Sequence, residues 1–422
     1  MTNDNISSWG LLGPEQVQSV RRARTLEVGS AVRIFNDLSV PGMGGVWFGK
    51  QLMLSLMGVA VAGRLDGRSR MRNIEMANTV EALACCLAFK SNQWQSDARL
   101  RGRRKMSGTK ELLFRAMRNP SFYVTQPMRM ATIQPLRALG LVDADGERFN
   151  AFRITPAGED FLRIACGRAP VVERLVAWVQ AQKSWNGSSA LAAVLSPLES
   201  LNPQAREYLH ALLAHSGAGC DRRAAGIAWV KGQAGGDAIV NWEIKPSMIT
   251  EGHWKDMHAG ALFFLARDAA LNTLDALETY MGNTVAQVEL QNPLPDVLGS
   301  KVSNLRNAAN AYLGMAHDPS NGIAKALCDE LSNNDDAAVL RALVMRDGRV
   351  LRLEQEVVLP ASAYRGAFTD RSAIQDALQS EDEPPPPTAG RWPPGASRRL
   401  ANLYLMNLDL YGTLMPNAEE IA

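Results

Sequence analysis

The chain has 422 residues, of which 46% are hydrophobic and 21% are charged. This balance excludes a mainly disordered chain, a collagen and a coiled-coil rod, and the length predicts two or three domains. The longest apolar stretch, residues 52–62, is shorter than the roughly 20 residues that a membrane span needs. The start of the chain, residues 1–8, is polar and lacks an export signal. We therefore expect a cytoplasmic protein that does not associate with a membrane.

Positive charge is concentrated in the first part of the chain. Residues 1–150 contain 21 Lys and Arg against 12 Asp and Glu, whereas the remainder contains 24 against 31. Because Arg bonds phosphate oxygens with a forked geometry, this asymmetry favours an anionic partner such as nucleic acid. The alternative is a solvated basic face that pairs with the acidic remainder. The Arg clusters are Arg21, Arg22 and Arg24, then Arg64, Arg68, Arg70 and Arg72, and finally the run Arg99, Arg101, Arg103, Arg104 and Lys105.

Three helices are expected before residue 100. Pro14 suits the first turn of a helix over residues 14–30. Residues 46–65 are apolar on nearly every side, which predicts a helix at the centre of a core. Residues 73–90 place apolar side chains at spacings of four, three and four positions, which lines one helix face.

The clearest pattern lies in residues 107–166. Two helical stretches are followed by a short hairpin and by a third helix, which Thr155 caps and Pro156 opens. Pro135 falls inside the second stretch, where an interior proline costs about 3 kcal/mol. The predicted elements are helices over 107–118 and 125–139, strands over 141–142 and 148–154, and a helix over 155–166.

The rest of the chain is predicted to be mostly helical. A hairpin is expected over residues 343–353, turning at Asp347-Gly348. Residues 381–396 form an acidic, proline-rich linker. Ser397 caps a last amphipathic helix, from Arg398 to Tyr411, which docks back on the body. The other predicted helices cover residues 170–183, 203–214, 254–281, 301–315 and 322–332.

The order of elements in residues 107–166 resembles the winged helix-turn-helix DNA-binding domain. The resemblance is carried by the Leu-Arg-Ala-Leu-Gly-Leu-Val sequence of residues 136–142 and by residues 148–158, which end in Thr155-Pro156-Ala157-Gly158. It covers about 60 residues and implies a recognition helix followed by a wing hairpin. We therefore predict a mainly α fold, with this domain embedded in a basic N-terminal region (1–168). A larger helical body (169–380), the linker (381–396) and a docking segment (397–422) follow.

The resemblance implies a non-enzymatic protein that binds DNA, most simply duplex DNA. The size of the remaining chain favours a subunit of a larger bacterial assembly on DNA, such as an anti-phage or DNA-processing complex, with other protein subunits as partners. A large regulator fits as well. Phosphate contacts are expected from Arg99, Arg101, Arg103, Arg104 and Lys105, and groove contacts from Gln126, Arg129, Thr132, Gln134, Arg137 and the wing residue Arg148.

Two alternatives stay open. Residues 238–245 resemble the strand that carries Glu-x-Lys in PD-(D/E)xK nucleases, with Glu243 as a metal ligand and Lys245 steadying the attacking water. Such a nuclease still needs a further acid, for which Asp221 or Asp237 is available. The winged helix can also act as a protein-interaction scaffold.

No cofactor or metal motif is otherwise present. Gly44 to Lys50 matches GxxxxGK, but Gln51 stands where a P-loop needs Ser or Thr.

Overall fold

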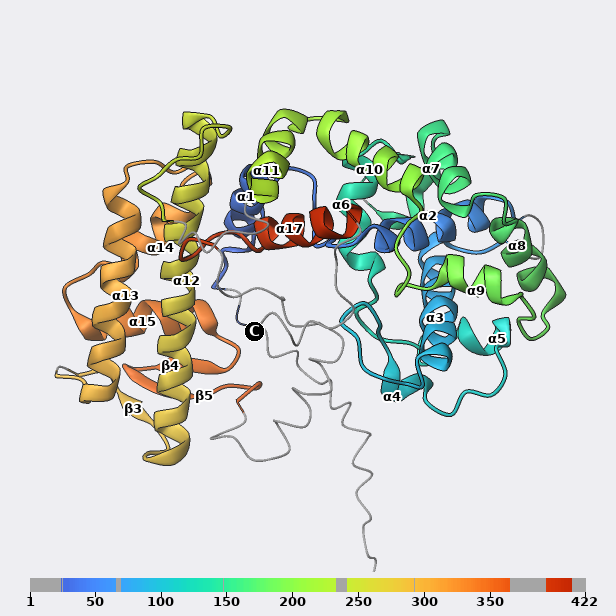
Figure 1. Ribbon diagram of the computed structural model, residues 1–422. Coiled ribbons are helices and arrows are strands. Elements are labelled where there is room, and N and C mark those ends of the chain that lie inside the picture. The colour runs from blue at the N-terminus through green and yellow to red at the C-terminus, as the bar shows by residue number, and fades with distance from the viewer. Residues whose placement is uncertain are drawn as a thin grey trace, which may run out of the picture.

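The computed structural model describes residues 24, 26–65, 70–146, 148–232, 241–291, 293–364 and 392–411. These residues are mainly helical and contain two small antiparallel sheets (Figure 1). None of the described helices is both long and apolar enough to cross a lipid bilayer. The helices are α1 (Gly29–Ser39), α2 (Gly49–Gly63), α3 (Asn73–Ser91), α4 (Arg103–Met106), α5 (Phe114–Met117), α6 (Arg129–Ala138), α7 (Pro156–Cys166), α8 (Val171–Ala181), α9 (Ser189–Leu195), α10 (Pro203–His215), α11 (Cys220–Gly232), α12 (Glu251–Asn283), α13 (Asp296–Gly314), α14 (Ile323–Leu331), α15 (Asp336–Asp347) and α17 (Arg398–Leu410).

The strands form one hairpin and one three-stranded sheet. The hairpin joins β1 (Val142–Ala144) to β2 (Phe152–Ile154), with the 3-10 turn η2 (Phe149–Ala151) between them. The second sheet has the order β3-β5-β4, and both of its pairings are antiparallel. Its strands are β3 (Val288–Glu289), β4 (Leu351–Glu354) and β5 (Val357–Pro360).

Most of the chain packs around a first core that is built on α2. Every residue of α2 from Gly49 to Ala62 is buried, as its nearly continuous apolar sequence predicts. Gly58 allows α3 to cross α2 at close range, because a Cβ atom at this position would lie 2.3 Å from the Cα of Ala77. Helices α6 to α11 and α17 surround this pair.

A second core lies beside the first (Figure 1). It contains α1, α13, α14, α15 and the three-stranded sheet. The 33-residue helix α12 belongs to both cores, since Trp254 and Met257 pack in the first and Phe263 and Leu274 in the second. The predicted domain limit at residue 168 falls inside the first core, which contains buried residues on both sides of it.

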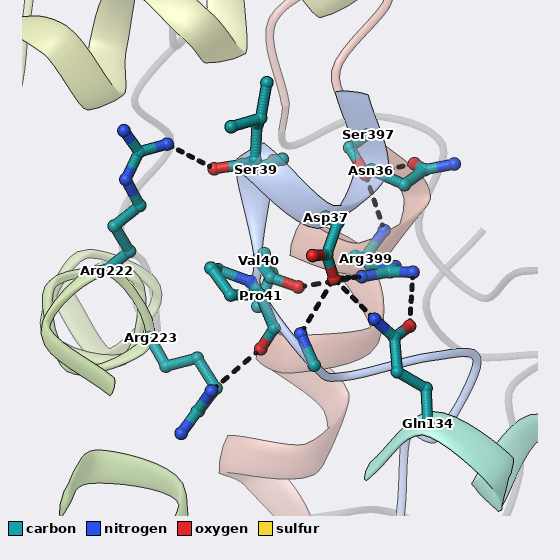
Figure 2. A network of polar contacts seen from close by, with 12 residues as sticks. Asn36, Asp37, Ser39, Val40, Pro41, Gln134, Arg222, Arg223, Ser397 and Arg399 are labelled. Carbon is teal, nitrogen blue, oxygen red and sulfur yellow. Dashed lines mark hydrogen bonds and ion pairs between the residues drawn. The ribbon is translucent and has the colours of Figure 1, made fainter. Parts of the chain in front are cut away.

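A polar network joins α1 to α6 and α17 where the two cores meet (Figure 2). The Asp37 carboxylate accepts hydrogen bonds from the Gly42 backbone (3.0 Å), the Gln134 amide (2.6 Å) and the Arg399 guanidinium (2.9 Å). Burial opposes ionisation of this carboxyl, but the three donors hold its pKa below the ordinary value. The side chain of Ser397 donates to Asn36 at 2.6 Å beside it.

The fully buried Arg223 of α11 completes this junction. Its guanidinium donates to the carbonyl oxygens of Pro41 at 3.1 Å, Leu213 at 2.9 Å and Ala218 at 3.0 Å, and also to that of Ser216. A buried charge is tolerated because carbonyl dipoles replace its hydration. The loop at residues 40–45 is therefore fixed to the turn between α10 and α11.

Most predicted helices are present, and three predicted elements differ. The strand expected over 148–154 begins only at Phe152, because residues 149–151 form η2. Of the helix expected over 107–118, only the four-residue α5 is present. The turn predicted at Asp347-Gly348 is instead the end of α15, where Gly348 has a φ of +55°, and the β4–β5 hairpin turns at Gln355-Glu356. Most of the helix expected over 14–30 and most of the linker at 381–396 lie outside the described residues. Helices α1, α4, α9, α11 and α15 were not predicted.

Candidate nucleic-acid interface

The short hairpin predicted before the helix at 155–166 is present, and it lies between α6 and α7. Gly140 follows α6 with a φ of +69°, which turns the chain into β1. Val142 of β1 pairs with Ile154 of β2 in the antiparallel hairpin. The Thr155 hydroxyl then accepts a hydrogen bond from the Gly158 backbone at 3.1 Å and caps α7, as the sequence predicts.

The helix expected at residues 107–118, before α6, is replaced by an extended segment and the four-residue α5. The backbone N–H of Leu112 donates to the Ser184 hydroxyl at 3.1 Å. Its carbonyl oxygen accepts from the Trp185 backbone at 2.9 Å and from the Trp178 indole at 3.1 Å. Because these partners take the backbone groups that a helix would use, the segment stays extended.

Pro135 lies inside α6 without interrupting it. A proline has no N–H to offer the carbonyl four residues earlier, which here belongs to Ala131. The Gly45 backbone N–H donates to this carbonyl at 3.3 Å instead. The loop at 40–45 therefore supplies the hydrogen bond that Pro135 removes, and it lies directly against α6.

Two of the three faces of α6 are covered. Thr132 and Leu136 face the first core and are fully buried. On the next face, a Cβ atom at Gly44 would lie 2.5 Å from the Ala131 oxygen, and one at Gly217 would lie 2.2 Å from the Ala138 oxygen. The chain therefore approaches α6 there too closely for a nucleic-acid groove to be admitted. The stripe of Met130, Ile133 and Arg137 stays at least partly open, and the Gln134 side chain is exposed as well.

Some of the residues expected to contact bases are buried in the protein, and others are exposed. Arg129 and Thr132 are buried, with exposed fractions of 8% and 0%, and Arg129 donates to the Asn78 side chain at 2.7 Å. The amide of Gln134 is shared between Asp37 and Arg399 (Figure 2). Arg129 and Thr132 are therefore enclosed in the protein, which corrects the expectation that they face a groove. Gln134 is exposed, and its amide is engaged by the neighbouring Asp37 and Arg399 side chains. Gln126 is half-buried, whereas Arg137 and Arg148 are exposed.

The N-terminus of α6 is anchored by a buried carboxylate. Glu81 of α3 accepts hydrogen bonds from the backbone N–H groups of Met128 (2.7 Å) and Arg129 (3.0 Å) and from the Tyr123 hydroxyl (2.8 Å). Burial raises the pKa of Glu81, while these donors and the nearby Arg101 act in the opposite direction. The first turn of α6 is thus fixed to α3.

The Arg99–Lys105 run is divided between the interior and the surface. Arg99 pairs with Asp97 at 2.9 Å and donates to the Leu198 oxygen, and Arg101 donates to the Gln126 oxygen at 2.7 Å. Both are buried, so the expectation that they contact phosphate is corrected. The other three members, Arg103, Arg104 and Lys105, are exposed, and Lys105 also donates to the Tyr123 oxygen at 3.0 Å.

A basic hollow lies beside the wing, where the sequence did not place one. It has a volume of about 840 Å³ and lies between the end of α2, the start of α3 and the hairpin. Arg70, Arg72 and Arg153 line it, together with apolar groups such as Leu65 and Phe152. We call it the wing hollow. The sequence contained one signal for it, the Arg70 and Arg72 cluster, but no indication that β2 lies next to that cluster.

The nuclease alternative finds no support in the described residues, which do not include positions 233–240. Residues 241–249 form turns rather than a strand. Lys245 donates to the Ile249 oxygen at 2.8 Å, and Glu243 is exposed. No group of three or more His, Cys, Asp or Glu side chains suited to a metal ion occurs in the part of the chain that the structure describes. Asp237 lies outside it.

Comparisons with family models, with curated proteins and with solved structures find no match to this chain.

Proposed function

We propose that the protein binds duplex DNA through the phosphate backbone, using the basic surface of the first core and without inserting α6 into a groove. In this proposal α6, β1, β2 and α7 form a winged-helix unit whose wing side, rather than its recognition helix, faces the nucleic acid. Phosphate contacts position a protein on DNA and do not read its sequence.

The observation that carries the proposal is the charge of the first part of the structure. The described residues up to 232 contain 27 Lys and Arg against 14 Asp and Glu, whereas those from 241 onward contain 12 against 17. Several exposed guanidinium groups have no hydrogen-bond or ion-pair partner among the described residues, and such groups are suited to bidentate phosphate contacts. They include Arg70, Arg72, Arg103, Arg115, Arg137 and Arg148.

The second core supports the view of a subunit in a larger DNA-associated assembly, such as an anti-phage or DNA-processing complex. Its described residues carry a net negative charge and no candidate metal site. We infer that this core contacts other proteins while the first core contacts DNA.

The proposal is tested by titrating a labelled 30-base-pair duplex with the full chain at several salt concentrations. Four or more phosphate contacts predict a slope of log K against log salt of about −3.6 or steeper. Unrelated duplex sequences are expected to bind with similar affinity. Absence of binding at ~50 mM salt and micromolar protein contradicts the proposal, because backbone contacts are strongest at low salt.

A protein-interaction scaffold is the second candidate function. The open stripe of α6 contains Met130, which is 48% exposed, and the partly exposed Ile133. Apolar side chains of this kind suit a protein partner better than phosphate. A shallow salt dependence in the same titration, together with loss of a partner protein on Met130→Asp, favours this second function.

A further inference from the structure

The segment before α6 is tied along the side of α3 at two points. Near the end of α3, the Lys90 ammonium donates to the Lys110 carbonyl oxygen at 3.2 Å. Near its start, the Arg118 guanidinium pairs with Glu75 at 2.6 Å. Positions 75 and 90 are separated by about four helical turns, so they lie on the same side of α3 and roughly 22 Å apart.

Exposed cations follow this line and lead to the wing hollow. Glu75 also lines the wing hollow, which places the Arg118 end of the line next to Arg70 and Arg72. Lys110, at the first tied point, and Arg115, between the two points in sequence, are exposed and have no ion pair with a described residue. We call this set the basic track, and it consists of Lys90, Lys110, Arg115, Arg118, Arg70, Arg72 and Arg153.

The acidic residues beside the track do not cancel its charge. Glu75 is neutralised by Arg118, and Glu111 stands exposed beside Lys110. At the wing, Arg153 pairs with Asp145 at 3.1 Å and lies 3.8 Å from Asp143, and all three side chains are more than half exposed. Exposed pairs of this kind contribute little and exchange readily for a phosphate partner.

A second hollow, lined by the end of β2, by α7 and by the start of α8, shows the contrast. It has a volume of about 520 Å³ and contains as many acidic as basic side chains. The charged groups that line it are Arg64, Arg163, Arg168, Glu159, Asp160 and Glu173. The excess of positive charge therefore lies on the α3 side of the wing.

We propose that the basic track holds the sugar-phosphate backbone of one strand of duplex DNA, with the wing hollow at one end of the contact. This inference rests on the proposed function. It adds where the DNA contact lies on the first core and which feature of the surface stands at one end of it. Cations arranged along roughly 22 Å match about six base pairs at 3.4 Å each. A small anion would instead need cations that converge on one point.

The test compares two variants that remove the same charge from the same core. The track variant replaces Arg70, Arg72 and Arg115 with Ala, and the control variant replaces Arg168, Arg174 and Lys183 with Ala. All six side chains are exposed, so both variants are expected to keep the parental melting temperature, which is measured first. Each is then titrated with a 30-base-pair duplex at salt concentrations between ~50 and ~200 mM.

Loss of three phosphate contacts predicts a slope of log K against log salt that is shallower by about 2.7 in the track variant. Raising the salt from ~50 to ~200 mM weakens DNA binding by both proteins. The factor by which the affinity falls is roughly 40 times smaller for the track variant than for the parent. The control variant is expected to keep the parental slope. Equal effects of the two variants would contradict the proposal that the basic track is the contact surface. They would not contradict the proposed function of DNA binding. A parent chain that does not bind the duplex at all overturns both the track and the proposed function.

Discussion

The carboxylate of Asp409, near the end of α17, accepts a hydrogen bond of 2.8 Å from the backbone N–H of Gly49, the first residue of α2. The two residues are 360 positions apart in the chain. A carboxylate at this position satisfies a free N–H group and interacts favourably with the helix dipole. The GxxxxGK pattern that ends at Lys50 is therefore structural, because the protein's own carboxylate takes the place that a phosphate would need.

Asp409→Ala is expected to destabilise the protein by about 1–3 kcal/mol, since it leaves the buried N–H of Gly49 without an acceptor. Asp409→Asn keeps an acceptor and is expected to cost less. Denaturant titration of both variants measures the difference. Equal losses for the two variants would show that the hydrogen bond contributes nothing beyond packing.

Buried and exposed members of the Arg99–Lys105 run are expected to respond differently to mutation. Arg101→Ala removes a buried guanidinium that donates to the Gln126 oxygen, so it should cost several kcal/mol of unfolding free energy. Arg103→Ala, at an exposed position, should change stability by less than about 0.5 kcal/mol. Thermal melting of the two single variants decides between these expectations. A stable Arg101→Ala variant would contradict the structural role that we assign to this side chain.

Lys50 should give the protein an unusual dependence on alkaline pH. Its side chain is buried, with the ammonium donating to the Val194 oxygen, and burial lowers its pKa to about 8. Between about pH 8 and the ordinary value of 10.5, the unfolded chain binds this proton and the folded chain does not. Folding stability from this group therefore rises with pH across the window, by about 1.4 kcal/mol per unit.

Lys50→Met removes this contribution and is expected to flatten the pH dependence between pH 8 and 10.5. Denaturant titrations of the parent and the variant at half-unit steps measure it. Parallel profiles for the two proteins would show that Lys50 keeps its ordinary pKa in the folded state.

Docking of α17 is tested by a charge on its buried face. Leu403 is 1% exposed, and a Cβ atom at Gly226 of α11 would lie 3.0 Å from its side chain. Leu403→Asp should therefore cost several kcal/mol. Asn402→Asp, at a partly exposed position on the same helix, adds the same charge and should have a small effect. Similar melting temperatures for the two variants would exclude tight docking of α17.

The sequence correctly predicted the elements that depend on residues close to one another in the chain. The apolar run of α2, the spacing of apolar residues in α3 and the Thr155-Pro156 start of α7 all gave correct helices. The turn at Asp347-Gly348 was misplaced because a glycine with positive φ serves a helix end as well as a hairpin. The true turn, Gln355-Glu356, adopts positive φ without glycine or asparagine, so its sequence contains no turn signal.

The candidate site was less predictable because its determinants are distant in sequence. Arg101 looks solvated in a run of cations, and only the fold brings the Gln126 oxygen to it. Leu112 reads as helical, and its extended conformation depends on Ser184 and Trp185. The Arg70 and Arg72 cluster was visible in the sequence, but its position next to Arg153 required the packing of the wing against α2 and α3.

Helix α12 has a consequence for how the molecule unfolds. At 33 residues it is about 50 Å long, and it contributes packing surface to both cores without a break. If one core unfolded, the half of α12 that packs in it would no longer stabilise the other half of the helix. The remaining core would then lose part of its packing surface. The two cores therefore behave as one cooperative unit, and calorimetry should record a single transition rather than two separate ones.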